Sequence, residues 1–180
     1  GCHVGEGVEA AVRLDQAEPD LTAATDNQLA TTGVFGQHAA RAVWLPIPSN
    51  LPTRSNSGDL ERARASLGPG PWIAHFGTYS PLIASDLGAA ILAIARARKE
   101  VRFLLLGRRA RGFKDAYRLD ERVEAREDLP SADVAALLEA STVALQPFPD
   151  GISARRTSAM APLALGVPVV TTDGFLTDAV

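Results

Sequence analysis

The sequence is poor in residues that several classes of protein depend on. Its single cysteine, Cys2, excludes an internal disulfide and a cysteine-rich metal site. Three scattered histidines, His3, His38 and His75, show no metal-ligand spacing, so we expect neither a metal nor another cofactor. A formal net charge of -3 argues against a nucleic-acid partner, and no apolar run approaches the roughly 20 residues of a membrane span.

What is present is typical of a globular chain with room for one well-buried domain. Hydrophobic residues make up 46% of the 180 positions and charged residues 22%, which is ordinary for a folded protein. The chain opens on "GCHVGEGVEAAV" without a clear strand and closes on "TTDGFLTDAV", where a new helix is expected. We therefore expect an internal segment of a longer protein, with targeting signals outside it.

Short apolar and β-branched runs alternate with helical patterns along the chain. Several runs are apolar at consecutive positions, as strands covered on both faces should be. Helices are predicted over 58–68, 85–100 and 131–141, and another from Ser153. This alternation predicts an α/β fold with a Rossmann-like parallel sheet. The predicted strands are 21–25, 42–47, 72–77, 101–107, 122–126, 142–147 and 167–172.

One linker-like segment divides the predicted helices and strands into two groups. The segment "LPIPSNLPTRSNSG" (45–58) is rich in proline, serine and asparagine, which is typical of a linker or hinge. Too few elements precede it to form a domain, whereas an orderly αβαβαβ series follows it. We therefore interpret residues 1–50 as the tail of one α/β lobe and residues 51–180 as most of a second, Rossmann-like lobe.

Ligands of open parallel sheets bind beyond the carboxyl ends of the strands. In the first loop that leaves such an end, Gly77 permits close backbone approach, while Thr78, Tyr79 and Ser80 supply hydroxyls. The candidate loops are 75–82, 105–114, 125–131 and 149–160.

These loops also have simpler interpretations. A glycine after a strand is more often ordinary turn chemistry than a phosphate loop. His75 fits a hydrogen-bonded core residue slightly better than a ligand, and Tyr79 fits the wall of a site equally well. The cationic run "RRARGFK" (108–114) is more often a solvated face, and is only weak evidence for peripheral membrane contact.

The stretch "PDGISARRTSAM" (149–160) breaks a local rule. If Ser153 caps a helix, Arg155 and Arg156 lie in the first turn, where each cation costs a few tenths to about 1 kcal/mol. A bound phosphate would resolve the conflict, because helix amides and arginines both bind phosphate oxygens. The alternative is that the arginines pair with Asp150 or another carboxylate.

The order of motifs resembles a known family. The runs "WIAHFGTYSPL", "FLLLGRR" and "DLPSADVAALLEASTVALQPFPDGISARRTSAMAPLALGVPVVTTDG" resemble the C-terminal lobe of glycosyltransferases with the two-lobed GT-B fold. The resemblance is to the retaining enzymes called family 4, or glycosyl transferases group 1. It covers roughly residues 21–180 and is most specific over 129–174. It implies that residues 1–50 end the acceptor lobe and that 51–180 form the donor lobe, truncated at its end.

The resemblance also implies roles for particular residues. The loop from Gly77 to Ser80 (Gly77, Thr78, Tyr79, Ser80) would approach the diphosphate of a nucleotide diphosphate sugar. The base would meet the segment after the third strand of the lobe: Arg126, Glu127, Asp128 and Leu129. The sugar and phosphates would meet the segment around the predicted helix start: Gly151, Ile152, Ser153, Arg155 and Arg156.

The sequence departs from the family at several positions. Ser153 and Ala161 stand where many members carry two glutamates, and the usual arginine and lysine after the first strand are missing. The catalytic residue is therefore unknown, and His3 is not assigned that role.

The resemblance implies retaining transfer of a sugar from a nucleotide diphosphate sugar to a sugar, lipid or small-molecule acceptor. We also expect a cytoplasmic location, including the inner face of a membrane, no required metal because no acidic pair is placed to hold one, and no activity for the fragment by itself. Two alternatives stay open: a nucleotide-sugar epimerase on the same fold, with Asp150 and Asp173 as its carboxylates, and a non-catalytic nucleotide-binding lobe.

Overall fold

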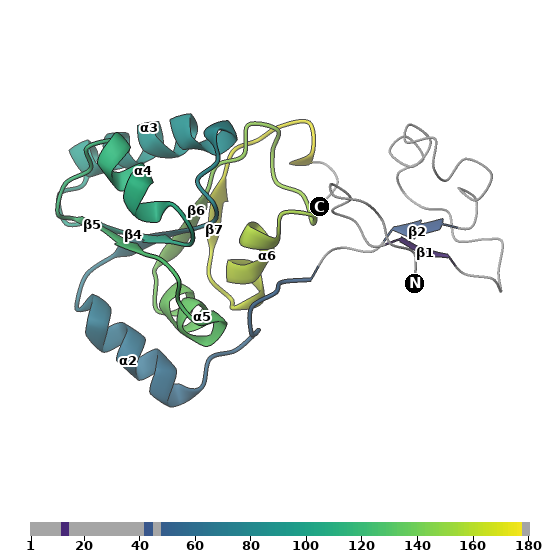
Figure 1. Ribbon diagram of the computed structural model, residues 1–180, viewed down its shortest axis with the longest axis horizontal. Helices are drawn as coiled ribbons and strands as arrows, with labels where there is room; N and C mark the ends of the chain where they lie inside the picture. Colours follow the sequence, from purple (N-terminus) through teal and green to yellow (C-terminus); the bar gives the residue numbers. More distant parts are fainter. Residues whose placement is uncertain (1–11, 15–41, 45–47, 178–180) are drawn as a thin grey trace. The chain divides into compact units, whose positions relative to one another are not determined.

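The computed structural model describes residues 12–14, 42–44 and 48–177 of the chain (Figure 1). Contacts divide the chain into two compact units, Gly1–Ile47 and Pro48–Val180. Each unit is described by itself below.

The first unit contains a two-stranded sheet within its described residues. Strands β1 (Val12–Leu14) and β2 (Ala42–Trp44) pair antiparallel, with Val12 opposite Trp44. Strand β2 falls inside the strand predicted over 42–47, whereas β1 was not predicted. The strand predicted over 21–25 lies outside the described residues.

The second unit is built on a five-stranded sheet in which all neighbouring strands run parallel. The strand order β5-β4-β3-β6-β7 confirms the predicted α/β class and Rossmann-like sheet. Each strand lies within one of the predicted runs and is slightly shorter than it. The strands are β3 (Trp72–Phe76), β4 (Arg102–Leu106), β5 (Val123–Arg126), β6 (Val143–Gln146) and β7 (Val169–Thr171).

Three of the helices confirm the periodic patterns of the sequence. Helix α2 begins after Asn56, whose side-chain oxygen accepts a hydrogen bond from the Asp59 amide, and it ends at Gly68 with φ 70°. Helix α4 was not predicted, because the cationic run 108–114 was interpreted as a loop. The helices are α2 (Ser57–Leu67), α3 (Pro81–Ala97), α4 (Ala110–Ala116), α5 (Ser131–Glu139) and α6 (Thr157–Ala164).

Helices cover both faces of the sheet (Figure 1). On one face, Trp72 and Leu104 pack with buried residues of α2, α5 and α6. On the other face, Phe103 and Leu105 pack with buried residues of α3 and α4. Each fully buried side chain of this size stabilises the fold by about 1.5–3 kcal/mol. Alternate strand residues serve opposite faces, which explains why the central strands are continuously apolar.

The strand order reverses beside the central strand β3. The chain runs from β3 through β4 to β5 at one edge, then returns through α5 to β6 on the other side of β3. The loops after β3 and β6 therefore leave neighbouring strand ends toward opposite faces of the sheet. We call these two carboxyl ends and the loops 77–80 and 147–156 the switch point. It is the place where open α/β sheets bind ligands.

Candidate functional site

The first loop of the switch point is held close to the sheet by two glycines. The Gly77 amide donates to the Leu106 carbonyl at 3.0 Å, which ties the loop to the end of β4. A Cβ on Gly107, whose φ is 111°, would lie 2.2 Å from the Gly77 carbonyl oxygen. A Cβ on Gly77 would lie 3.0 Å from the ring of His75. Glycine at both positions lets the two loops touch through their backbones.

The Tyr79 side chain turns into the core. Its hydroxyl donates to the His75 and Leu106 carbonyls, at 3.4 and 3.3 Å, and the residue is 5% exposed. Burial, and secondly the charge of Glu127, raise the pKa of Tyr79 well above its usual range, so the phenol stays protonated. The loop therefore presents Thr78, Ser80 and its main chain, and the Tyr79 ring belongs to the core.

His75 is the hydrogen-bonded core histidine that the sequence favoured. The residue is 1% exposed, and its Nδ1 lies 2.8 Å from the Leu145 carbonyl of β6, so Nδ1 carries the proton. Burial lowers the pKa of His75 to about 4, against a smaller opposing effect of this hydrogen bond. The neutral ring thus ties the two central strands together beneath the switch point.

A polar residue that the sequence analysis missed lies in the same place. Gln146, at the end of β6, is fully buried and donates from Nε2 to the Phe76 carbonyl at 3.1 Å. Its Oε1 finds no hydrogen-bond partner among the described residues. The signal in the sequence was a glutamine that closes an otherwise apolar strand.

The second loop of the switch point is held in place by residues 174–177, which follow β7. Gly151 has φ 89°, and a Cβ there would lie 2.4 Å from the Thr177 hydroxyl oxygen. The Leu176 amide donates to the Asp150 carbonyl at 3.0 Å. Ile83 at the start of α3 packs with Phe148, Ile152 and Ala159. This apolar cluster joins the second loop to the start of α3, which directly follows the first loop.

The predicted helix start is wrong. Helix α6 begins at Thr157 with Arg156 at the N-cap position, whereas Ser153 was expected to cap it. Because contacts with residues 174–177 hold Asp150 and Gly151, the chain first makes a turn, in which the Arg156 amide donates to the Ser153 carbonyl at 2.9 Å. The two arginines therefore precede the helix, and the dipole argument for a bound anion does not hold.

The two arginines have different surroundings. Arg156 forms an ion pair with Asp150 and lies over the Phe148 ring, 4.9 Å from its centroid, which confirms for this residue the alternative of internal pairing. Arg155 is half-buried and forms no ion pair within the described residues. Beside them, Ser153 Oγ and Asp150 Oδ1 are buried and lack a hydrogen-bond partner in the described part of the chain. Arg155 and the Ser153 hydroxyl are therefore available to form hydrogen bonds with a ligand.

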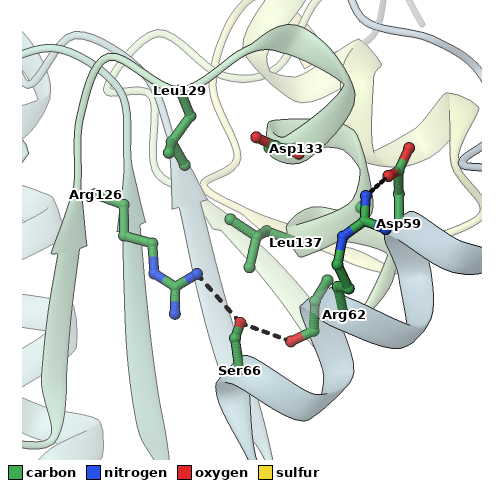
Figure 2. A pocket seen from close by; sticks show the side chains of 9 residues that line it. Asp59, Arg62, Ser66, Arg126, Leu129, Asp133 and Leu137 are labelled. Carbon is green, nitrogen blue, oxygen red and sulfur yellow. Dashed lines mark hydrogen bonds and ion pairs between the residues drawn. The ribbon is translucent and has the colours of Figure 1, made fainter.

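The segment proposed for the base is divided between two surfaces. Arg126 pairs with Glu124 at 2.6 Å and donates to Ser66 at 3.2 Å, and with Leu129 it lines a pocket of 180 Å³ beside α2 and α5 (Figure 2). Glu127 instead accepts a hydrogen bond from the Arg111 amide at 2.9 Å, near α4. Asp128 has φ 55° and lies exposed between them. The structure thus does not gather these four side chains around one cavity.

Two further searches cover only the described residues. Within them, no cluster of three or more histidine, cysteine or acidic side chains is arranged to hold a metal ion. No helix in the same ranges combines the length and apolar character needed to cross a membrane.

The second unit is thus a Rossmann-like α/β fold with polar groups gathered at its switch point. Solved structures with a similar fold are glycosyltransferases of the GT-B type. WaaG, a glycosyltransferase involved in lipopolysaccharide biosynthesis, matches with a TM-score of 0.56 at 17% identity, over 72% of this chain and 37% of its own. Sucrose-phosphate synthase from Thermosynechococcus elongatus gives 0.52 at 22% identity, over 72% and 34%. Anabaena HepE, solved in complex with UDP-glucose, gives 0.51 at 19% identity, over 68% and 35%.

These similarities confirm the fold expected from the sequence motifs. No protein-family model matches the chain, and no curated protein matches it. The chain spans about a third of the length of the solved structures just described. The described second unit has the fold of part of a GT-B glycosyltransferase.

Proposed function

We propose that the chain is the donor-binding part of a retaining glycosyltransferase, which transfers a sugar from a nucleotide diphosphate sugar to an acceptor. The observation that carries the proposal is the switch point itself. Two loops leave neighbouring strand ends there, and the second of them carries Arg155 and the buried Ser153 hydroxyl. The GT-B likeness and the resemblance over 129–174 support the same assignment.

In this proposal the residues act mainly by stabilising negative charge. As the bond to the sugar breaks, charge develops on the leaving diphosphate, and donors already in position stabilise it without reorganisation. Main-chain amides of residues 78–80 and the Arg155 guanidinium supply those donors, and Ser153 adds a hydroxyl. Tyr79 supports the loop from the core and does not itself contact the phosphate.

We take UDP as the first nucleotide to test because HepE was solved with UDP-glucose. Calorimetric titration of the chain should show saturable binding of UDP and much weaker binding of uridine, since uridine lacks the phosphates. Equal affinity for UDP and uridine would contradict a phosphate role for the switch point.

Turnover separates this proposal from its rivals. We infer that the 180-residue chain binds the donor without consuming it, because the resemblance gives it only the tail of an acceptor lobe. In a protein that carries both lobes, release of UDP with sugar transfer supports the transferase. Isomerisation of the sugar would support the epimerase, and binding without turnover would support a non-catalytic lobe.

A further inference from the structure

Strands β3 and β6 stop pairing before they reach the switch point. Strand β3 stays paired with β4 as far as Phe76, but its register with β6 stops at Ala74 and Ala144. The last two residues of each strand therefore lie where the ladder between β3 and β6 is interrupted. Backbone groups at such an interruption need other hydrogen-bond partners, because a buried backbone group without one destabilises the fold.

Two side chains bridge the interruption in opposite directions. From β3, His75 donates through Nδ1 to the Leu145 carbonyl of β6 at 2.8 Å. From β6, Gln146 donates through Nε2 to the Phe76 carbonyl of β3 at 3.1 Å. Both bridging residues are at most 1% exposed. Buried side chains thus replace the backbone ladder in holding the two strand ends together.

The hydrogen bond from Gln146 fixes one particular peptide group. The Phe76 carbonyl accepts this hydrogen bond. The Gly77 amide, which belongs to the same planar peptide group, donates to the Leu106 carbonyl at 3.0 Å. The group is therefore held from β6 on one side and from β4 on the other. Because the loop 77–80 begins with this group, its orientation sets the direction in which the loop leaves the sheet.

The loop that follows has amides available for a ligand. The amides of Thr78, Tyr79 and Ser80 donate to no acceptor among the described residues. Tyr79 has φ 54°, a left-handed conformation that a bulky residue keeps only where surrounding contacts impose it. Hydrogen-bond donors stabilise developing charge best when they are already in position. The contacts that fix the start of the loop therefore matter for what its amides can bind.

Packing alone does not explain a glutamine at the end of β6. The Oε1 atom of Gln146 is buried and has no hydrogen-bond partner in the part of the chain that the structure describes. An oxygen in that state destabilises a fold. A methionine would fill nearly the same space without an unpartnered oxygen. The Nε2 hydrogen bond to the Phe76 carbonyl is the feature that a methionine could not supply.

We propose that Gln146 is a positioning residue for the diphosphate of the sugar donor. It acts through the Phe76–Gly77 peptide group, and it holds the amides of residues 78–80 in the arrangement that binds the diphosphate. The inference rests on the proposed function for the identity of the ligand. The order of the loop, in contrast, is measurable without any ligand.

Gln146→Met tests the inference, because methionine has a similar length but lacks the Nε2 hydrogen-bond donor. The urea midpoint should stay close to that of wild type, since the variant loses one hydrogen bond and also the unpartnered oxygen. In calorimetry the UDP dissociation constant should rise about three- to tenfold, as expected for one hydrogen bond. The uridine constant should not change, because uridine carries no phosphate.

Ser141→Ala is the matched control. Ser141 is also buried, and its hydroxyl donates to the Leu137 carbonyl at 2.8 Å, but it precedes β6 and so lies at the opposite end of that strand from the switch point. The control variant loses a hydrogen bond of the same kind and should bind UDP as wild type does. An equal loss of UDP affinity in the two variants would show a general effect of weakening the core and would overturn the proposal.

NMR of the chain without ligand separates this inference from the proposed function. In Gln146→Met the amide signals of Thr78, Tyr79 and Ser80 should shift and their ¹⁵N order parameters should fall, with no change in Ser141→Ala. Unchanged signals in Gln146→Met overturn the proposal. If wild type does not bind UDP, the proposed function fails, while the altered signals would still show that Gln146 positions the loop. Gln146→Leu, which lacks the same hydrogen-bond donor, replaces the methionine variant if that variant does not fold.

Discussion

Two neighbouring arginines, alike in the sequence, have different tasks in the structure. Arg156 is already paired with Asp150 and stacked on Phe148, so it mainly stabilises the loop. Replacing it would leave a partly buried carboxylate without its cation, which costs more than the pair itself contributes. Arg155 has no such partner in the described residues and is the better candidate for binding phosphate.

We predict that Arg155→Ala weakens UDP binding by about 1.5–3 kcal/mol, the value of a hydrogen bond to a charged group. Calorimetry on the folded variant measures the change. Arg64→Ala, on the exposed side of α2, removes an equal charge and should leave the dissociation constant unaltered. An unaltered constant in Arg155→Ala would remove this residue from the site.

His75 gives a prediction about pH. Burial lowers its pKa from 6.5 to about 4, so between these values the unfolded chain binds a proton that the folded chain does not. The resulting contribution, about 3 kcal/mol if fully expressed, is present above pH 6.5 and is lost as the pH falls toward 4. Urea unfolding at pH 7.5, 5.5 and about 4.5 should show this decline in wild type.

A matched variant isolates the histidine. His75→Asn keeps a donor for the Leu145 carbonyl but cannot titrate, so its stability should fall less between pH 7.5 and 5.5. The same decline in variant and wild type would show that other groups cause it.

At the scale of whole elements, we predict that replacing glycine by alanine has opposite effects on stability in α3 and in α4. Gly88→Ala should destabilise the unit by about 1–3 kcal/mol through overpacking, since a Cβ there would lie 2.2 Å from the Tyr117 ring. Gly112→Ala in α4 should stabilise by up to about 1 kcal/mol, because no atom lies within 4 Å and alanine favours helix. Urea midpoints measure both, and equal signs would contradict the described packing.

The elements also show where sequence patterns succeed. Strands β3, β4, β6 and β7 were predictable because consecutive apolar or β-branched residues and flanking turn residues mark strands covered on both faces, whereas β5 (VEAR) was recognised only from its place in the alternation. Helix α4 was missed because its seven residues, which include a glycine, one arginine and one lysine, carry no clear periodicity.

The start of α6 was misjudged because tertiary contacts decide it. Ser153 has the chemistry of an N-cap, but Gly151 and Asp150 are held by residues 174–177, and the helix starts only at Thr157. The segment proposed to bind the base was also misjudged, because the sequence does not show which surface each of its charged side chains reaches. Arg126 and Glu127 follow each other at a strand end, where successive side chains point to opposite faces. No local pattern specified which face each would serve.

At the scale of the molecule, the second unit has the features of an independent folding domain. It contains a sheet core with two covered faces, drawn from β3, β4, β5 and β6 and from the helices that pack on them. We predict that residues 48–180, expressed alone, unfold cooperatively in urea and bind UDP as tightly as the 180-residue chain. Loss of UDP binding in a folded 48–180 protein would mean that the first unit contributes directly to the donor site.

The contact between Gly77 and Gly107 constrains any attempt to alter ligand preference by mutation. Any side chain at position 107 would collide with the carbonyl of the neighbouring loop and displace it. A library that randomises either loop without keeping its glycine would therefore return mostly misfolded or inactive clones. Productive variants should change both loops in concert, or retain the two glycines and diversify only Thr78 and Ser80.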